Sequence, residues 1–109
     1  MKKLIVFGVA LLIAGAVSVR AADAKAIWAK DCTKCHGEDG KGKTRMGERL
    51  GIKDYTNAKV QDALKDDAMT KAIKDGVKEG DKTKMKGFGD VLSDDEVKAL
   101  VKYVRDFKK

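Results

Sequence analysis

The clearest hydrophobic pattern lies at the C-terminal end of the chain. Its apolar residues recur at the spacing of a single helix face; they are Val97, Leu100, Val101, Val104 and Phe107. Ser93 and Glu96 stand just before this stripe, three residues apart, which is the spacing of a capping box. The pattern predicts an amphipathic helix that begins after Ser93 and packs its apolar stripe into a core.

Three earlier stretches also have helical spacing. The first leads up to a pair of cysteines and places on one face Ala24, Ile27, Trp28 and Asp31. The second begins after a cap at Thr56 or Asn57 and carries Val60, Ala63 and Leu64. The third runs from about Asp67 to Lys74, ends at Gly76, and carries Ala68, Met69, Ala72 and Ile73.

Two stretches lack helical periodicity. The segments from Gly37 to Gly51 and from Val77 to Asp90 are rich in glycine and charge, and both are predicted to be loops. No run of four or more residues alternates convincingly between apolar and polar positions, so we expect no sheet. The predicted fold class is all-α.

The N-terminal residues have the pattern of a secretory signal peptide. Lys2 and Lys3 precede an unbroken apolar run from Leu4 to Val17, and Val19-Arg20-Ala21 supplies small residues before a cleavage site. The run is shorter than the roughly 20 residues that span a bilayer, which argues against a permanent membrane anchor. A buried core helix is the other alternative to a signal peptide. We expect residues 1–21 to be a signal peptide and residues 22–109 to form one exported, periplasmic domain without stable membrane insertion.

Size and charge limit the classes of function. The chain has 109 residues and a formal net charge of +7, but Lys2, Lys3 and Arg20 leave with the signal peptide. The remaining residues are enough for only one domain, which excludes most multidomain enzymes. A domain this short is only marginally stable without a covalent staple or a cofactor. Acidic residues are scattered along the rest of the chain, so nucleic-acid binding is not expected.

The candidate chemistry concentrates in one short motif. The two cysteines and the single histidine of the chain are Cys32, Cys35 and His36, in the C-x-x-C-H pattern of c-type haem attachment. Thiols at i and i+3 lie on one helix face and can add to the two vinyl groups of one porphyrin. His36 then ligates the iron, and its other ring nitrogen is expected to donate to a carbonyl. We predict one haem c, held covalently by two thioethers.

Other interpretations of these residues fit less well. A disulfide between Cys32 and Cys35 would suit a thiol–disulfide oxidoreductase, but no strand-like run precedes the motif. A zinc site would need further cysteine or histidine ligands. The segment from Gly37 to Thr44 matches the phosphate-binding pattern G-x-x-x-x-G-K-T. Without a preceding strand, it is predicted to be a flexible surface turn.

The second axial ligand of the iron decides the function. A methionine thioether closes the site and raises the potential, whereas an open site suits gas binding or peroxide chemistry. Met46 follows His36 too closely to pass around the macrocycle, and Met69 lies on an apolar helix face that suits core packing. Met85 lies in an irregular, glycine-flanked stretch with ample chain to wrap the haem. We therefore favour Met85 as the ligand, with Met69 next.

Together these motifs resemble a class I monohaem cytochrome c of the small soluble bacterial kind, over essentially the whole exported domain. The matching segments are Cys32–Gly37, Met85–Gly89 and Leu92–Arg105. Trp28 and Tyr103 match aromatics at the place where the first and last helices of the family cross. The resemblance implies a cytochrome c fold, with three to five short helices wrapped around one covalent haem.

Two features differ from the family pattern. Lys86 stands where a proline usually follows the distal methionine, and the chain contains no proline at all. The proline carbonyl that commonly accepts the proton of the proximal histidine is therefore missing. A backbone carbonyl between Gly42 and Gly51 is expected to replace it. These differences bear on the rigidity of the ligand loops more than on the identity of the ligands.

The expected function is electron transport without enzymatic activity, by a monomer that carries single electrons between periplasmic redox proteins. Lys82, Lys84 and Lys86 bracket Met85; they either form a basic rim that favours acidic partners or belong to an ordinary solvated loop. The alternative is a haem-based ligand sensor or a peroxidase-like enzyme, which would require a labile Met85.

Overall fold

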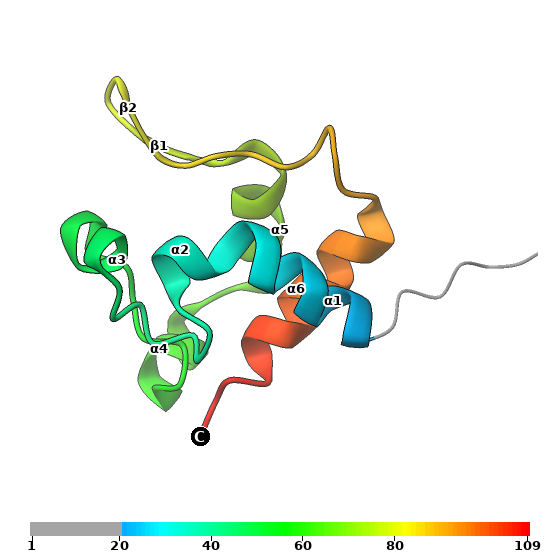
Figure 1. Cartoon of the computed structure of the whole chain (residues 1–109), viewed down its shortest axis with the longest axis horizontal. Coiled ribbons are helices and arrows are strands. Elements are labelled where there is room, and N and C mark those ends of the chain that lie inside the picture. Colours follow the sequence, from blue (N-terminus) through cyan, green and yellow to red (C-terminus); the bar gives the residue numbers. More distant parts are fainter. Residues whose placement is uncertain (1–20) are drawn as a thin grey trace, which may run out of the picture.

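The computed structural model describes residues 21–109 (Figure 1). The expected signal peptide therefore lies outside the described residues, apart from Ala21. Helix α1 (Ala21–Ile27) continues without a break through the π-helix η1 (Trp28–Cys32) into α2 (Thr33–His36). Four separate helices follow it within the described residues, and they are α3 (Arg45–Leu50), α4 (Ala58–Ala63), α5 (Asp66–Asp75) and α6 (Asp94–Arg105). The described chain thus contains five helical segments, and the predominantly helical fold is confirmed.

The first and last helical segments cross, as the family resemblance implies (Figure 1). The Trp28 ring lies 5.5 Å from that of Tyr103 and 5.1 Å from that of Phe107, measured between centroids. The indole nitrogen of Trp28 donates a buried hydrogen bond of 3.0 Å to the carbonyl of Gly37. Trp28 therefore joins the N-terminal helix both to α6 and to the end of the cysteine motif, Cys32–His36.

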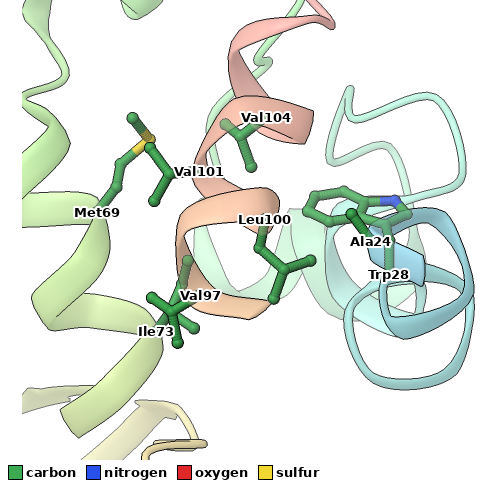
Figure 2. Close-up of a cluster of buried hydrophobic side chains, with 8 residues drawn as sticks. All are labelled: Ala24, Trp28, Met69, Ile73, Val97, Leu100, Val101 and Val104. Carbon is green, nitrogen blue, oxygen red and sulfur yellow. The ribbon is translucent and has the colours of Figure 1, made fainter. Parts of the chain in front are cut away.

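Helix α6 lies at the centre of the hydrophobic core (Figure 2). Its predicted capping box is present, because the Ser93 side chain accepts from the Glu96 amide and the Glu96 carboxylate accepts from the Ser93 amide. Residues of α1, η1 and α5 pack on its two sides. The buried apolar residues of the described chain are Ala24, Trp28, Met69, Ile73, Val97, Leu100, Val101 and Val104. This core is small for a domain of this length.

Helix α4 is held mainly by polar contacts, which its apolar spacing does not indicate. Ala63 is exposed, whereas Gln61 is 3% exposed. The Gln61 amide donates to the carbonyls of Tyr55 at 2.7 Å and Val104 at 2.8 Å. The Asn57 side chain caps this helix by accepting from the amides of Lys59 and Val60. Because Gln61 holds the backbone of Tyr55, it also positions an aromatic ring of the candidate site.

The expectation that residues Gly37 to Gly51 form a loop is wrong for the second half of the segment. Helix α3 occupies Arg45–Leu50, and it begins because the Thr44 hydroxyl accepts from the Gly47 amide at 2.8 Å. The same hydroxyl donates to the carbonyl of Cys35 at 2.7 Å. Gly47 packs so closely that an added Cβ would overlap the carbonyl oxygens of Cys35 and Gly42. The Thr44 cap and the close contact with the cysteine motif stabilise this helix, so it forms without an apolar stripe.

The expectation of no sheet is also wrong for the described chain. Strands β1 (Val77–Glu79) and β2 (Lys82–Met85) form an antiparallel hairpin in which Val77 pairs with Met85. The hairpin projects from the helices (Figure 1), and its residues are exposed except Met85, which is half-buried. Apolar and polar positions do not alternate because neither face of the hairpin is buried. The hairpin brings Met85 back to the body of the domain.

Candidate haem-binding site

A cavity of about 690 Å³ opens between the cysteine motif, α5 and the base of the hairpin. This volume lies within the range of roughly 300–1,000 Å³ that is typical of small-molecule sites. Residues at its wall include Cys32, Cys35, His36, Tyr55, Met85 and Phe88. The cavity continues into an apolar floor formed by Ile27, Met69, Ile73, Leu92, Leu100 and Val104. Its size and mostly apolar lining suit a large apolar ligand.

The two thiols lie one helical turn apart at this wall. Cys32 ends η1 and Cys35 lies in α2, and both are half-buried and free of disulfide bonds. Burial, followed by the charges of Asp31 and Cys35, raises the pKa of Cys32 to about 12. A thiol–disulfide oxidoreductase needs a thiol that ionises readily. The environment of Cys32 opposes that alternative and suits a thiol held in an apolar site.

His36 lies between two aromatic rings. Its ring centroid is 5.4 Å from that of Trp28 and 5.4 Å from that of Tyr55, and the imidazole and the tyrosine ring are stacked at 26°. Burial lowers the pKa of His36 below its usual value. The imidazole is therefore neutral near pH 7, and this is the form that ligates a metal ion. Both rings limit the orientations that the imidazole can adopt.

The expected carbonyl partner of His36 is absent from the described structure. Nδ1 of His36 is buried, and no hydrogen-bond partner for it lies among the described residues. The loop that was expected to supply a carbonyl instead holds the backbone of the motif, because the Gly42 amide donates to the His36 carbonyl at 2.8 Å. The orientation of the imidazole therefore depends on aromatic packing rather than on the hydrogen bond predicted from the sequence.

The structure separates the three candidate methionines. Met85, at the end of β2, lines both the outer cavity and its floor, as does His36. Met69 lies on the floor and is 8% exposed. Met46 lies in α3 and lines a separate pocket with Lys34, Arg45 and Arg49. Met46 therefore does not line the cavity that contains His36, and Met85 remains the predicted ligand.

Two aromatic residues of the cavity are not singled out by the sequence pattern. Tyr55 lies in a polar segment between α3 and α4, and burial raises the pKa of its phenol, which stays neutral. Phe88 follows Met85 in an irregular stretch. Neither belongs to a periodic stripe. An isolated aromatic residue in a polar or glycine-rich loop is the one signal that could have indicated them.

The segment that matches the phosphate-binding pattern has a different role. It follows α2 rather than a strand, which argues against nucleotide binding. It forms turns, as predicted, and Glu38, Asp39 and Lys43 are exposed, but Gly37, Gly40 and Gly42 are buried, so only part of the segment lies on the surface. A Cβ at Gly40 would lie 2.7 Å from the ring of Phe107. The segment packs on Phe107, which follows α6, and it contacts the end of the cysteine motif through the hydrogen bond from the Gly42 amide to the His36 carbonyl.

Two crossing terminal helices, a C-x-x-C-H motif and an apolar cavity define the class of small monohaem class I cytochromes c. The chain matches the family described as cytochrome c oxidase, cbb3-type, subunit III, over residues 19–104. It belongs to this family of c-type cytochrome domains.

Solved structures support the same class. A structure described as the KustC0563 c-type cytochrome has a TM-score of 0.70 and 36% sequence identity, covering 79% of this chain and 98% of its own. A tyrosine-to-phenylalanine mutant of that protein has a TM-score of 0.68 and 36% identity, covering 79% of this chain and 99% of its own. No curated protein matches the chain.

Family membership supports a haem-binding electron carrier. The donor set agrees with this, because two thiols on one helix face, a neutral imidazole and a thioether line a single apolar cavity. These are the side chains that hold a c-type haem. Within residues 21–109, no helix is long and apolar enough to cross a membrane.

Proposed function

We propose that the chain is a soluble monohaem c-type cytochrome that carries one electron at a time between periplasmic redox proteins. In this proposal, Cys32 and Cys35 hold the haem through thioethers, and His36 and Met85 are the axial ligands of its iron. The observation that carries the proposal is that all four side chains line one cavity although Met85 is far from the motif in sequence. Residues 1–21 would direct the chain out of the cytoplasm.

The bound haem supplies a metal ion that accepts and releases one electron. The protein residues control that exchange. The apolar floor excludes water and keeps the local dielectric low, which disfavours the additional positive charge of the oxidised site. The neutral Met85 sulfur also favours the reduced state. His36 and Met85 would both hold the iron, so no ligand would need to be exchanged when an electron enters or leaves, and little reorganisation would accompany the transfer.

The mouth of the cavity is basic, which supports acidic redox partners. Five lysines line the outer cavity, and they are Lys30, Lys34, Lys53, Lys84 and Lys86. Asp31 is the acidic residue among the lining residues described. Lys84 is paired with Glu79 at 2.7 Å, and Lys82 of the expected rim does not line the mouth. The basic surface we propose is therefore centred on the cysteine motif as much as on the hairpin.

The first test of the function is spectroscopic. We expect the purified protein to show the near-infrared charge-transfer band of a ferric thioether-ligated haem, and a reduced spectrum that carbon monoxide does not change. A reversible one-electron titration should accompany these spectra. Rapid binding of carbon monoxide by the reduced protein would contradict the proposal and favour the ligand sensor or peroxidase-like alternative. A colourless folded protein would exclude both.

A second test addresses the basic mouth. Oxidation of the reduced protein by ferricyanide, an anion, should slow several-fold between low salt and about 0.5 M salt, because added ions screen the lysines. Oxidation by a cationic cobalt complex should accelerate over the same range. The double variant Lys34→Ala/Lys53→Ala should reduce the salt dependence, whereas Lys102→Ala, on α6 away from the mouth, should not. Equal salt dependence for both oxidants would contradict a basic docking surface.

A further inference from the structure

The chain leaves the hairpin by passing directly over the C-terminal end of α5. An added Cβ at Gly87 would lie 2.7 Å from the carbonyl oxygen of Lys74 and 2.7 Å from the carbonyl carbon of Asp75. At Gly89 it would lie 2.9 Å from the same Lys74 oxygen. Neither of these glycines has a positive φ. Both positions therefore require a small residue for space, and not for an unusual backbone conformation.

Two backbone hydrogen bonds fix this approach. The Phe88 amide donates to the Ile73 carbonyl at 2.8 Å, and the Gly89 amide donates to the Lys74 carbonyl at 2.9 Å. The last carbonyls of a helix have no partner within the helix, so the returning chain satisfies two of them in α5. Ile73 belongs to the buried core. The segment from Gly87 to Gly89 is thereby attached to a rigid part of the domain.

The other end of the hairpin is attached at the same place. Gly76 ends α5 with a φ of +80°, and an added Cβ there would overlap the Met85 carbonyl and the Gly87 amide. Lys74 also forms an ion pair with Asp94 at the start of α6. The chain therefore enters the hairpin at Gly76 and leaves it at Gly87, and these two glycines pack against each other. Met85 lies next to this contact.

We propose that Gly87 and Gly89 are positioning residues that hold Met85 as the axial ligand. This inference rests on the proposed function, in which Met85 binds the iron. The side chain that ordinarily stiffens such a loop is a proline after the methionine, and Lys86 occupies that position here. The close packing of Gly87 and Gly89 on the α5 carbonyls supplies the rigidity that the proline would otherwise give to the loop. A side chain at Gly87 would lift the loop from α5 and draw the Met85 sulfur away from the cavity.

The test compares three holoprotein variants with the wild type. We expect Gly87→Ala to lose most of the ferric thioether band while it keeps its covalent haem and its helical circular dichroism. Its reduced form should bind carbon monoxide about tenfold faster or more, because the rate rises with the fraction of molecules whose sixth position is open. Asp81→Ala is the control, because Asp81 lies in the exposed turn of the same hairpin, outside the contact with α5, and its backbone is not left-handed. It should retain the band. Met85→Leu provides the spectrum of the fully lost ligand.

The outcomes separate the inference from the proposed function. If Met85→Leu loses the band and Gly87→Ala keeps it with slow carbon monoxide binding, the positioning role is refuted and the ligand assignment stands. If Met85→Leu retains the wild-type spectrum, the ligand assignment fails, and the positioning role fails with it. Hydrogen exchange in the wild-type holoprotein gives a measurement that does not depend on folding of the variants. The Phe88 and Gly89 amides should exchange at least about a hundredfold more slowly than the amide of Asp81 in the turn. Equal exchange rates for these three amides would refute the close packing of this segment on α5.

Discussion

Replacement of both Cys32 and Cys35 by serine is expected to yield a chain that carries no covalent haem and does not fold compactly. Serine cannot form the thioethers. The cavity would then lack its main filling group, while its wall and floor remain largely apolar. Without haem, the protein would retain only the small core around α6, and a domain of this size buries too little surface to be stable on such a core alone.

The measurement is haem staining after denaturing electrophoresis, together with far-ultraviolet circular dichroism and thermal unfolding. We expect the double variant to lose the stain entirely and most of the helical signal. Lys34→Ala is the matched control because Lys34 lies between the two cysteines and is exposed. It should keep the pigment and the fold. A double variant that unfolds with wild-type cooperativity, or that still carries covalent pigment, would contradict the proposed attachment.

The helices that build the core could be predicted from the sequence because their signals are local. The stripe from Val97 to Val104 and the Ser93–Glu96 capping box place α6 correctly. The prediction for residues 67–74 matches α5, in which Met69 and Ile73 are buried and Gly76 ends the helix. In each case the apolar spacing agrees with a cap or a stop signal. Agreement between independent local signals makes an element predictable.

The elements that were missed are specified by contacts between distant residues. Helix α3 depends on Thr44 and on the close approach of Gly47 to the Cys35 carbonyl. The hairpin is exposed on both faces and leaves no alternating pattern. Gln61 is buried because it bridges two backbone carbonyls, one of which belongs to α6. None of these causes can be read from hydrophobic spacing.

The candidate site also has one part that the sequence predicts and another that depends on contacts between distant residues. The haem-binding motif could be recognised because the attachment chemistry requires two thiols and a histidine within five residues. Met85 was favoured from the length of chain needed to reach the other side of the haem, and it lines the same cavity as the motif. The surroundings of His36 did not follow. The missing partner of its Nδ1 and the stacked ring of Tyr55 arise from tertiary packing, as does the seating of Gly87 on α5.

The second large effect is expected from Met85→Leu, which removes the thioether and keeps most of the side-chain volume. The ferric thioether band should disappear, and the reduced protein should bind carbon monoxide rapidly. The reduction potential should fall by a sizeable part of the about 0.8 V range that axial ligands span, because a sulfur ligand that stabilises the reduced iron is lost. Covalent haem and helical content should stay unchanged, since Met85 is only half-buried.

Met69 and Met46 provide the controls for this prediction. Met69→Leu changes the floor of the cavity and should cost less than about 1.5 kcal/mol in stability, with the band retained. Met46→Leu alters a separate pocket beside Lys34 and Arg49 and should leave the spectrum and the potential unchanged. If the band is lost in Met69→Leu and retained in Met85→Leu, the sulfur ligand comes from α5 instead of the hairpin. The hairpin, and the close packing of Gly87 and Gly89 on α5, would then have no part in holding the iron.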